Sequence, residues 1–380
     1  MLKTLLLAAP AFVTLFWSMT LQLGQRQKHS PQAFLGKFMT VAFIVYLSHF
    51  LFFTPLPRIY MYVDPLYQYA MLLVYPLFHI YIRLLTIDSK WSFAKHGIYL
   101  AAPTILLLLY LVGMCWMSRA SYEQLLFGDG QPTTLAGGYQ RMVVLVIKIT
   151  FLIQVIFTVW KNSWLLKTYS HKAGQYYSDL ENSRIYKATI LNIAMLITAC
   201  TSLILGLLGR HFFEHELTRI ILASVIFSSM LFTIGLLGYR QVLINPTFEK
   251  PDKKNKTKAT TKISESKQQE LQLQLQKVID NKIYLNASLT IYDLASAIGS
   301  NRTYLSNYIN GEYKTNFSAY INSYRVKELQ ATIEKEPHLS LENLADAAGF
   351  GCVDSLKRAV KNETGLGFNE WKKQIQSTHK

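Results

Sequence analysis

Long apolar stretches alternate with short polar ones over the first two thirds of the chain. A helix needs about 20 apolar residues to cross the hydrocarbon of a bilayer, and several stretches reach that length with few charges. There are seven of them, at residues 4–23, 33–53, 65–85, 97–117, 141–160, 187–208 and 219–239. The pattern therefore predicts a seven-helix transmembrane domain over residues 1–245.

The first stretch has a second interpretation, a cleaved signal peptide, because Lys3 precedes an apolar run. However, Pro10 interrupts that run early, the apolar residues continue to Leu23, and no good cleavage site follows. We therefore expect a helix that is retained in the mature protein.

Lysine and arginine are unevenly distributed over the loops between these stretches. Ten fall in the loops after the first, third and fifth stretches, and six fall at the N-terminus and in the other loops. Short cytoplasmic loops carry the excess of these residues. The bias predicts that the N-terminus is outside the cell and that everything after Tyr239 is cytoplasmic.

The composition changes abruptly after Asn245. Residues 249–262 read EKPDKKNKTKATTK, which is lysine-rich, polar and without periodicity. This composition predicts a flexible juxtamembrane linker over residues 246–265. Its lysines could form a solvated spacer or a polybasic segment that adheres to anionic lipid.

Residues 266–380 have the pattern of a small all-α domain. Its first helix carries four apolar residues on one face, and Leu273 interrupts that stripe. The four are Leu271, Leu275, Val278 and Ile279. The helix could be the first packed helix of the domain, or a short coiled coil that pairs two chains into a homodimer.

Two segments of this domain share a pattern of two short helices around a glycine. In the first, an apolar face ends at Gly299 and a second apolar face follows. The two faces consist of Leu294, Ala295 and Ile298, then Leu305 and Ile309. Such a pair predicts a helix-turn-helix, whose second helix enters the major groove of DNA with its N-terminal residues. The candidate DNA-binding residues there are Ser300, Asn301, Arg302, Thr303, Tyr304, Ser306 and Asn307.

The pattern returns at residues 341–350, and residues 354–361 follow as a second candidate recognition helix. Its candidate DNA-binding residues are Asp354, Ser355, Lys357, Arg358 and Lys361. Residues 316–335 have helical spacing and predict a connecting helix that packs against both units. Two recognition helices on one connector could enter successive major grooves, about 34 Å apart.

These motifs resemble the AraC/XylS family of transcriptional regulators. The resemblance is carried by LASAIGSNRTYLSNYIN, NFSAYINSYRVKEL and LSLENLADAAGFGCVDSLKRAVKNETGLGFNEW, over about residues 283–373. With the seven apolar stretches, the chain looks like the membrane-bound AraC-type regulators of Bacteroidetes-like bacteria. The segment YYSDLE at residues 176–181 is also similar to that group.

The chain departs from the family pattern at four positions. The family usually has Ala, Phe, Phe and Pro where this chain has Leu329, Leu356, Val360 and Phe368. Three of these positions lie in the second helix-turn-helix unit or just after it. The second unit is therefore the less typical of the two, and its contribution to base readout stays open.

The net charge of +16 comes from 39 Lys and Arg against 23 Asp and Glu. Residues 1–245 carry +11, residues 246–262 carry +4 and residues 263–380 carry only +1. Most of the basic charge therefore belongs to membrane topology and to the linker. The prediction of DNA binding rests on the helix-turn-helix pattern and on locally placed basic residues instead.

Several polar residues inside or near the apolar stretches are candidates for other chemistry. Intramembrane polar residues are often functional, and we take four as candidates for sensing a ligand: Lys148, Gln154, His79 and Asn192. Residues 211–215 read HFFEH, which matches an inverted zinc-peptidase motif. They lie in a short external loop without a third ligand, so we expect no metal, no cofactor and no catalytic set.

The sequence as a whole predicts an all-α, multi-pass protein of a bacterial inner (cytoplasmic) membrane. Its expected function is a transcription regulator that couples an external or intramembrane signal to the binding of double-stranded promoter DNA. The signal, a small molecule or a protein, is unknown, and so is the oligomeric state. The alternatives are a membrane transporter or enzyme, or a receptor whose helix-turn-helix domain binds proteins rather than DNA.

Overall fold

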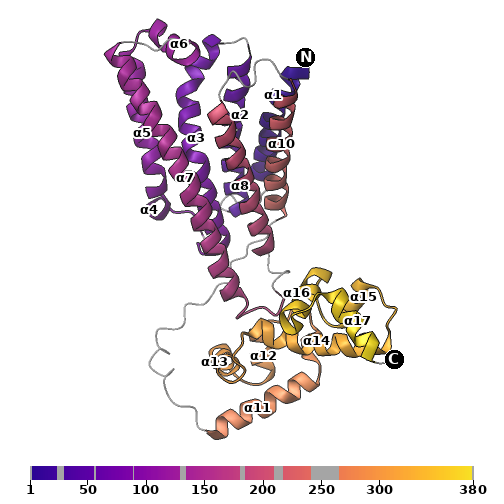
Figure 1. The fold of residues 1–380 in the computed structure, drawn as a ribbon. Coiled ribbons are helices and arrows are strands. Elements are labelled where there is room, and N and C mark those ends of the chain that lie inside the picture. Colours follow the sequence, from indigo (N-terminus) through magenta and orange to yellow (C-terminus); the bar gives the residue numbers. More distant parts are fainter. Residues whose placement is uncertain are drawn as a thin grey trace. The chain divides into compact units, whose positions relative to one another are not determined.

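The structure is a computed structural model that describes residues 2–23, 30–54, 57–88, 90–128, 134–179, 185–208, 217–240 and 265–378. Within these ranges it is helical and without a strand (Figure 1). One isolated β-bridge is found in the described chain. The chain divides into two compact units. The first comprises Met1–Leu165 and Lys187–Asn245, and the second comprises Leu166–Tyr186 and Pro246–Lys380.

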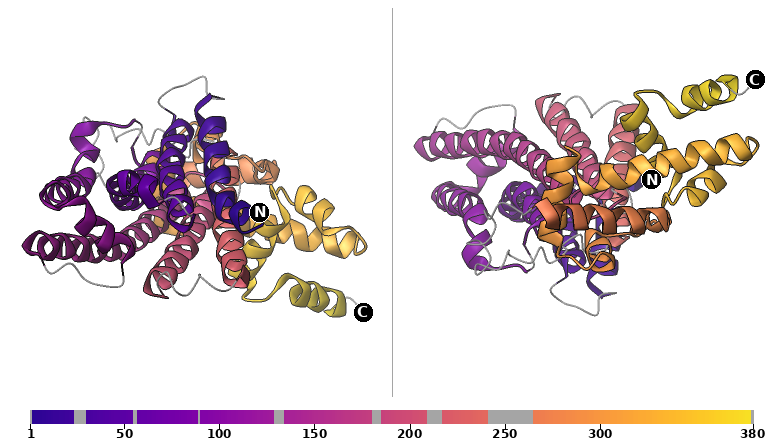
Figure 2. Two further views of the ribbon diagram at one scale, coloured as in Figure 1. Left: turned by 90° about the horizontal axis from the view of Figure 1, so that it is seen from above. Right: turned by 90° about the horizontal axis from the view of Figure 1, so that it is seen from below.

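Seven helices of the described chain are long and apolar enough to cross a membrane. They are α1 (Leu2–Leu23), α2 (Pro31–Phe53), α3 (Pro57–Thr86), α5 (Ile98–Trp116), α7 (Leu135–Ala173), α8 (Ile185–Leu208) and α10 (Leu217–Tyr239). Each of the seven predicted stretches is thus a helix, and Figure 2 shows the bundle from its two ends. Two short helices, α4 (Phe93–His96) and α6 (Arg119–Phe127), lie between the long ones along the chain.

The start of α3 differs from the prediction, in which the third apolar stretch begins at residue 65. The helix begins at Pro57, and Asp64 lies within it, fully buried. Its carboxylate accepts hydrogen bonds from Tyr60 Oη at 3.0 Å, from Tyr122 Oη at 2.7 Å and from Tyr110 Oη. These phenols compensate the desolvation of a buried carboxylate, which explains why a charged residue stands inside an apolar helix.

The outer surface of the first unit carries many large apolar side chains. Ile105 and Leu108 on α5, and Ile149, Ile153 and Ile156 on α7, are all exposed. Apolar patches of this extent are rare on soluble proteins. The surface suits contact with lipid, in agreement with the length of the helices.

The second unit contains the last turns of α7 and a set of shorter helices. They are α11 (Glu265–Asp280), the 3-10 turn η2 (Ile283–Leu285), α12 (Ile291–Ala297), α13 (Arg302–Glu312), α14 (Phe317–Lys335), α15 (Leu341–Ala347), α16 (Val353–Thr364) and α17 (Phe368–Thr378). The predicted linker lies almost entirely outside the described residues.

Two hydrophobic cores share the helix α14. The first core joins α11, α12 and α13 to the N-terminal half of α14, where Ile321 is fully buried. The second joins α15, α16 and α17 to the C-terminal half, where Leu329 is fully buried. The apolar stripe of α11 packs into the first core, as expected for the first packed helix, and Leu273 is exposed.

The turns of the two short-helix pairs have the same backbone form. Gly299 after α12 has φ +65°, and Gly349 after α15 has φ +76°. Only glycine adopts this left-handed region without strain. Each first helix also starts at a side-chain cap, from Thr290 for α12 and from Ser340 for α15. The repeated pattern in the sequence is therefore repeated in local structure.

Candidate nucleic-acid interface

The first group of candidate residues lies at the start of α13. Asn301 caps this helix, because its Oδ1 accepts a hydrogen bond from Tyr304 N at 2.8 Å. Thr303 and Asn307 are exposed. The other candidates of this group are partly buried, namely Ser300, Arg302, Tyr304 and Ser306. Tyr304 Oη is buried and has no hydrogen-bond partner among the described residues.

The second group lies on α16. Asp354, Lys357, Arg358 and Lys361 are exposed, and their spacing of three and four residues places them along one side of the helix. Ser355 differs from them because it is buried, at 9% relative exposure. The structure therefore keeps four of these five residues accessible to a partner.

A short segment from outside residues 266–380 packs onto both helix pairs. It comprises Gly174–Asp179, directly after α7, and we call it the bridging segment. Its backbone pairs with the residues that lead into α12: Ser178 N donates to Leu289 O at 3.1 Å. In return, Ile291 N donates to Tyr176 O at 2.9 Å. This pairing forms the isolated antiparallel β-bridge of the described chain.

The bridging segment also binds the first turns of α14. Ser318 N donates to Gly174 O at 2.9 Å, and Ser318 Oγ donates to Ser178 O at 2.9 Å. Arg325 Nη2 donates to Ser178 Oγ at 3.0 Å. Ser178 is fully buried by these contacts. Since both termini of the segment are held, its backbone is fixed along the connecting helix.

Tyr176 of the bridging segment covers the candidate residue Arg302. The Arg302 guanidinium carbon lies 4.6 Å from the centre of the Tyr176 ring, and Nη1 donates a hydrogen bond to Tyr176 Oη. A cation over an aromatic face is attracted by the ring quadrupole. Burial lowers the pKa of Arg302 from its usual value. The guanidinium is thus committed to a partner from its own chain.

Asp179 of the same segment binds the beginning of α16. Its Oδ2 accepts from Gly351 N at 2.9 Å, and its Oδ1 accepts from Ser355 Oγ at 2.5 Å. A carboxylate is favoured there, because the N-terminus of a helix carries partial positive charge. This contact explains the burial of Ser355. Ser355 is thus the second candidate residue, after Arg302, whose polar group is bound by the bridging segment.

The four candidate sensing residues are not brought together. His79 Nδ1 lies 2.6 Å from Asn162 Oδ1, and Asn192 Nδ2 donates to Ser163 Oγ at 3.0 Å, so these two residues contact neighbouring positions of α7. His79 Nε2 and Asn192 Oδ1 are buried without a partner among the described residues.

The other two candidates lie on α7 itself. Lys148 is exposed, and Gln154 is partly buried, with an Oε1 that lacks a hydrogen-bond partner in the described chain. In the described chain, His79 and Asn192 have their hydrogen bonds with Asn162 and Ser163 rather than with either of these two residues. His79 and Asn192 therefore take part in two separate buried polar contacts, and the four candidates do not form one converging site in the described chain.

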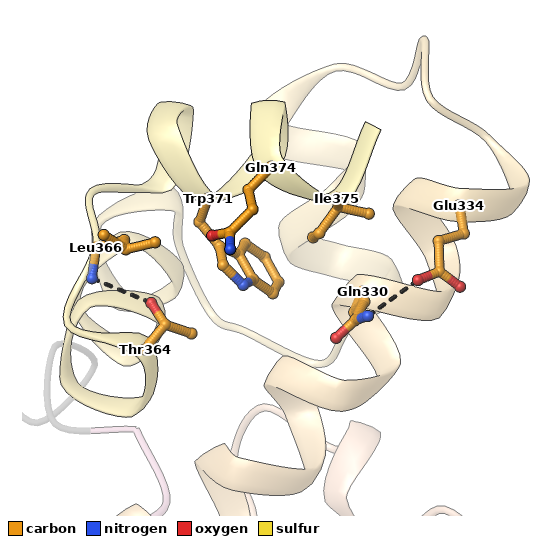
Figure 3. A pocket seen from close by; sticks show the side chains of 7 residues that line it. All are labelled: Gln330, Glu334, Thr364, Leu366, Trp371, Gln374 and Ile375. Atoms are coloured by element: carbon orange, nitrogen blue, oxygen red, sulfur yellow. Dashed lines mark hydrogen bonds between the residues drawn. The ribbon is translucent and has the colours of Figure 1, made fainter. Parts of the chain in front are cut away.

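Metal ligands do not cluster in the described residues, where no group of three or more His, Cys, Asp or Glu is found. The motif at residues 211–215 lies outside the described ranges. An open pocket of about 430 Å³ is found between α14 and α17 (Figure 3). Trp371 and Ile375 point into it, and Gln330 and Glu334 line its other side. It contains none of the candidate DNA-binding residues.

No protein-family model matches the chain, and no match is found among curated proteins or among solved structures.

The bridging segment is the part of this site that reasoning from the sequence did not place. It was predicted as part of a basic cytoplasmic loop, far along the chain from the helix pairs. The signal that could have found it is the motif YYSDLE at residues 176–181, which supplies both Tyr176 and Asp179.

Proposed function

We propose that this chain is a membrane-bound, sequence-specific DNA-binding transcription regulator of the AraC type. The observation that carries the proposal is the build of the second unit, in which two helix pairs with equivalent glycine turns share one connecting helix. A second helix that presents polar N-terminal residues is suited to the major groove. This is the layout expected of two helix-turn-helix units on one connector.

The exposed candidate side chains fall into two groups, those suited to base edges and those suited to phosphates. Asn307 on α13 can form paired hydrogen bonds to an adenine edge. Lys357 and Lys361 on α16 are suited to phosphate oxygens, which fix position without reading sequence. The near-neutral charge of the C-terminal part means that these local contacts, and not bulk attraction, would carry the affinity.

The proposed location is a bacterial inner membrane, with the N-terminus outside and the C-terminal unit in the cytoplasm. Seven apolar helices support a membrane protein, and the distribution of Lys and Arg supports this orientation. The proposed partners are promoter DNA, the bilayer, a signal that acts on the bundle, and a second copy of the chain. Buried polar atoms at His79 and Asn192 are where such a signal could act.

The test is selection of DNA by the full-length protein in lipid nanodiscs from a pool of random-sequence duplexes. We expect a defined sequence to be enriched and its affinity to fall steeply with salt. If the folded protein enriches no sequence at moderate salt, the proposal is wrong, and a protein-binding role for the second unit gains support.

Two variants separate base readout from phosphate contact on the selected duplex. Asn307→Ala should relax the preference at one base pair and cost about 1–3 kcal/mol of binding free energy. Lys361→Ala should weaken binding to all sequences and reduce the salt slope by about 1. Lys335→Ala is the control, because this exposed lysine lies at the far end of α14. Equal effects of all three would contradict these roles.

A further inference from the structure

The bridging segment holds one candidate DNA-binding residue in each helix pair. Tyr176 holds Arg302, the first residue of α13, and Asp179 holds Ser355 in the first turn of α16. Both residues are among the twelve candidates for DNA binding. The contacts therefore fall at the N-terminal ends of both candidate recognition helices.

The contacts of Asp179 are those that a DNA phosphate would form. Phosphate groups bind at helix N-termini through backbone N–H groups and hydroxyl side chains. Asp179 uses a backbone N–H, from Gly351, and a hydroxyl, from Ser355, with oxygens of the same charge. A phosphate and this carboxylate cannot occupy the same donors at the same time.

The bridging segment also engages Arg302, through Tyr176. Its guanidinium lies over the Tyr176 ring and is close to Tyr292 as well, at 5.9 Å from that ring centre. Arginine is the residue best suited to a phosphate or a guanine edge. To contact DNA, this side chain must leave the ring that now covers it.

The bridging segment is also the direct continuation of an apolar helix. The helix α7 runs without a break from Leu135 to Ala173, and Gly174 follows it. A displacement of α7 along its axis would act on the segment through one peptide bond. The other covalent connection from the apolar helices to the second unit runs through residues 241–264, between α10 and α11, and is far longer than this single bond.

We infer that the bridging segment is an autoinhibitory element that competes with the DNA phosphate backbone. In the docked state it occupies Arg302, Gly351 and Ser355, and the second unit binds DNA weakly. A signal that shifts α7 withdraws the segment and frees these groups. The inference rests on the proposed function and names the regulation of the same site.

The test compares full-length proteins in nanodiscs for their affinity toward one mixed-sequence 40-base-pair duplex. Tyr176→Ala removes the ring and hydroxyl that hold Arg302, and Gln175→Ala is the matched control from the same segment. Neither changes the net charge, so long-range attraction to DNA is unaltered. If the docked state dominates, Tyr176→Ala should bind about tenfold more tightly, and Gln175→Ala should bind as the unchanged protein does.

A disulfide lock that holds the bridging segment in its docked position tests the opposite change, and this test does not depend on Tyr176→Ala being stable. Tyr177 and Thr290 face each other in the antiparallel bridge, between its two hydrogen bonds. Residues in such a pair have Cα atoms about 4.5 Å apart, within the range of a disulfide. The lock is Tyr177→Cys with Thr290→Cys, in a protein whose native cysteines are replaced by serine.

Oxidation of the lock should lower DNA affinity, and reduction of the same sample should restore it. The inference is overturned if the oxidised form binds as well as the reduced form, or if Tyr176→Ala weakens binding in a folded protein. Either result would mean that the segment only braces the two helix pairs. If no variant binds DNA in any state although circular dichroism shows it folded, the proposed function is wrong, and the inference falls with it.

Discussion

Arg325 is a fully buried arginine whose hydrogen bonds in the described chain all go to neutral acceptors. Its Nε donates to Tyr284 O at 2.7 Å, and Nη2 donates to Asn286 O at 2.8 Å and to Ser178 Oγ at 3.0 Å. Burial lowers its pKa to about 10, so it stays charged at neutral pH. A planar guanidinium has five N–H donors in a fixed fork, so it can satisfy several neutral acceptors at once, whereas an ammonium has three donors. One side chain thereby joins α14, the turn η2 and the bridging segment.

Glu328, one turn further along α14, is the carboxylate of a smaller network. Lys282 Nζ lies 2.7 Å from its Oε1, and Tyr284 Oη donates to its Oε2 at 3.0 Å. The hydrogen bond from Lys282 lowers the pKa of Glu328, against the opposing effect of burial. A carboxylate with a lowered pKa stabilises the folded state above its unfolded pKa of about 4.3, and this contribution is lost as the pH falls through the folded value.

We therefore expect Glu328→Gln to lower the stability of the second unit at pH 7 by less than about 1 kcal/mol, because Lys282 is half exposed. The variant should also lose less stability than the unchanged protein between about pH 5 and pH 3. Urea midpoints from pulse proteolysis of the full chain in nanodiscs measure both. Glu363→Gln, at an exposed position, is the control. If Glu328→Gln lost more stability on acidification than the unchanged protein, the lowered pKa of Glu328 would be contradicted.

At the scale of elements, the two glycine turns look equivalent from the sequence but differ in their surroundings. A Cβ on Gly299 would meet nothing within 4 Å. A Cβ on Gly349 would meet the backbone of Leu285 at 2.5–2.7 Å. The second helix pair therefore touches the turn η2 of the first half through this glycine, which leaves no room for a side chain.

This difference predicts unequal costs for the same substitution. Gly299→Ala should cost about 1 kcal/mol, from the strain of a left-handed backbone alone. Gly349→Ala has the same strain and should cost roughly a further 1–3 kcal/mol, because the backbone of Leu285 must move. The urea midpoints of the two variants provide the comparison. Equal midpoints would show that the contact at Leu285 relaxes freely.

The elements differ in how well the sequence predicts them, and the reason is physical. Apolar runs and apolar faces reflect burial directly, so the seven long helices and the buried Leu294, Leu305 and Ile309 could be predicted. The early start of α3 could not, because Asp64 is an acidic residue and two of its three phenol partners, Tyr110 and Tyr122, come from other helices. Polar contacts between remote segments leave no periodicity along the chain.

The same reason accounts for the part of the site that was missed. The exposed residues of α13 and α16 follow from helical spacing, but the docking of Tyr176 and Asp179 depends on a tertiary arrangement. The division of the chain shows this most clearly, because Leu166–Tyr186 groups with Pro246–Lys380 although the apolar helices α8 and α10 lie between them in the sequence. No single cut of the sequence into an N-terminal and a C-terminal domain produces this grouping.

For the whole molecule, the proposed function requires the second unit to face the cytoplasm, where the DNA is. The orientation follows from Lys and Arg in the loops and can be tested with single cysteines in a protein freed of Cys115, Cys200 and Cys352. Glu123→Cys on α6 and Lys90→Cys before α4 are both exposed positions, on loops that the bias places on opposite sides. In spheroplasts, a membrane-impermeant maleimide should label Glu123→Cys at once and Lys90→Cys only after lysis. The reverse pattern would place the candidate DNA-binding residues outside the cell, and no regulator could read a promoter from there.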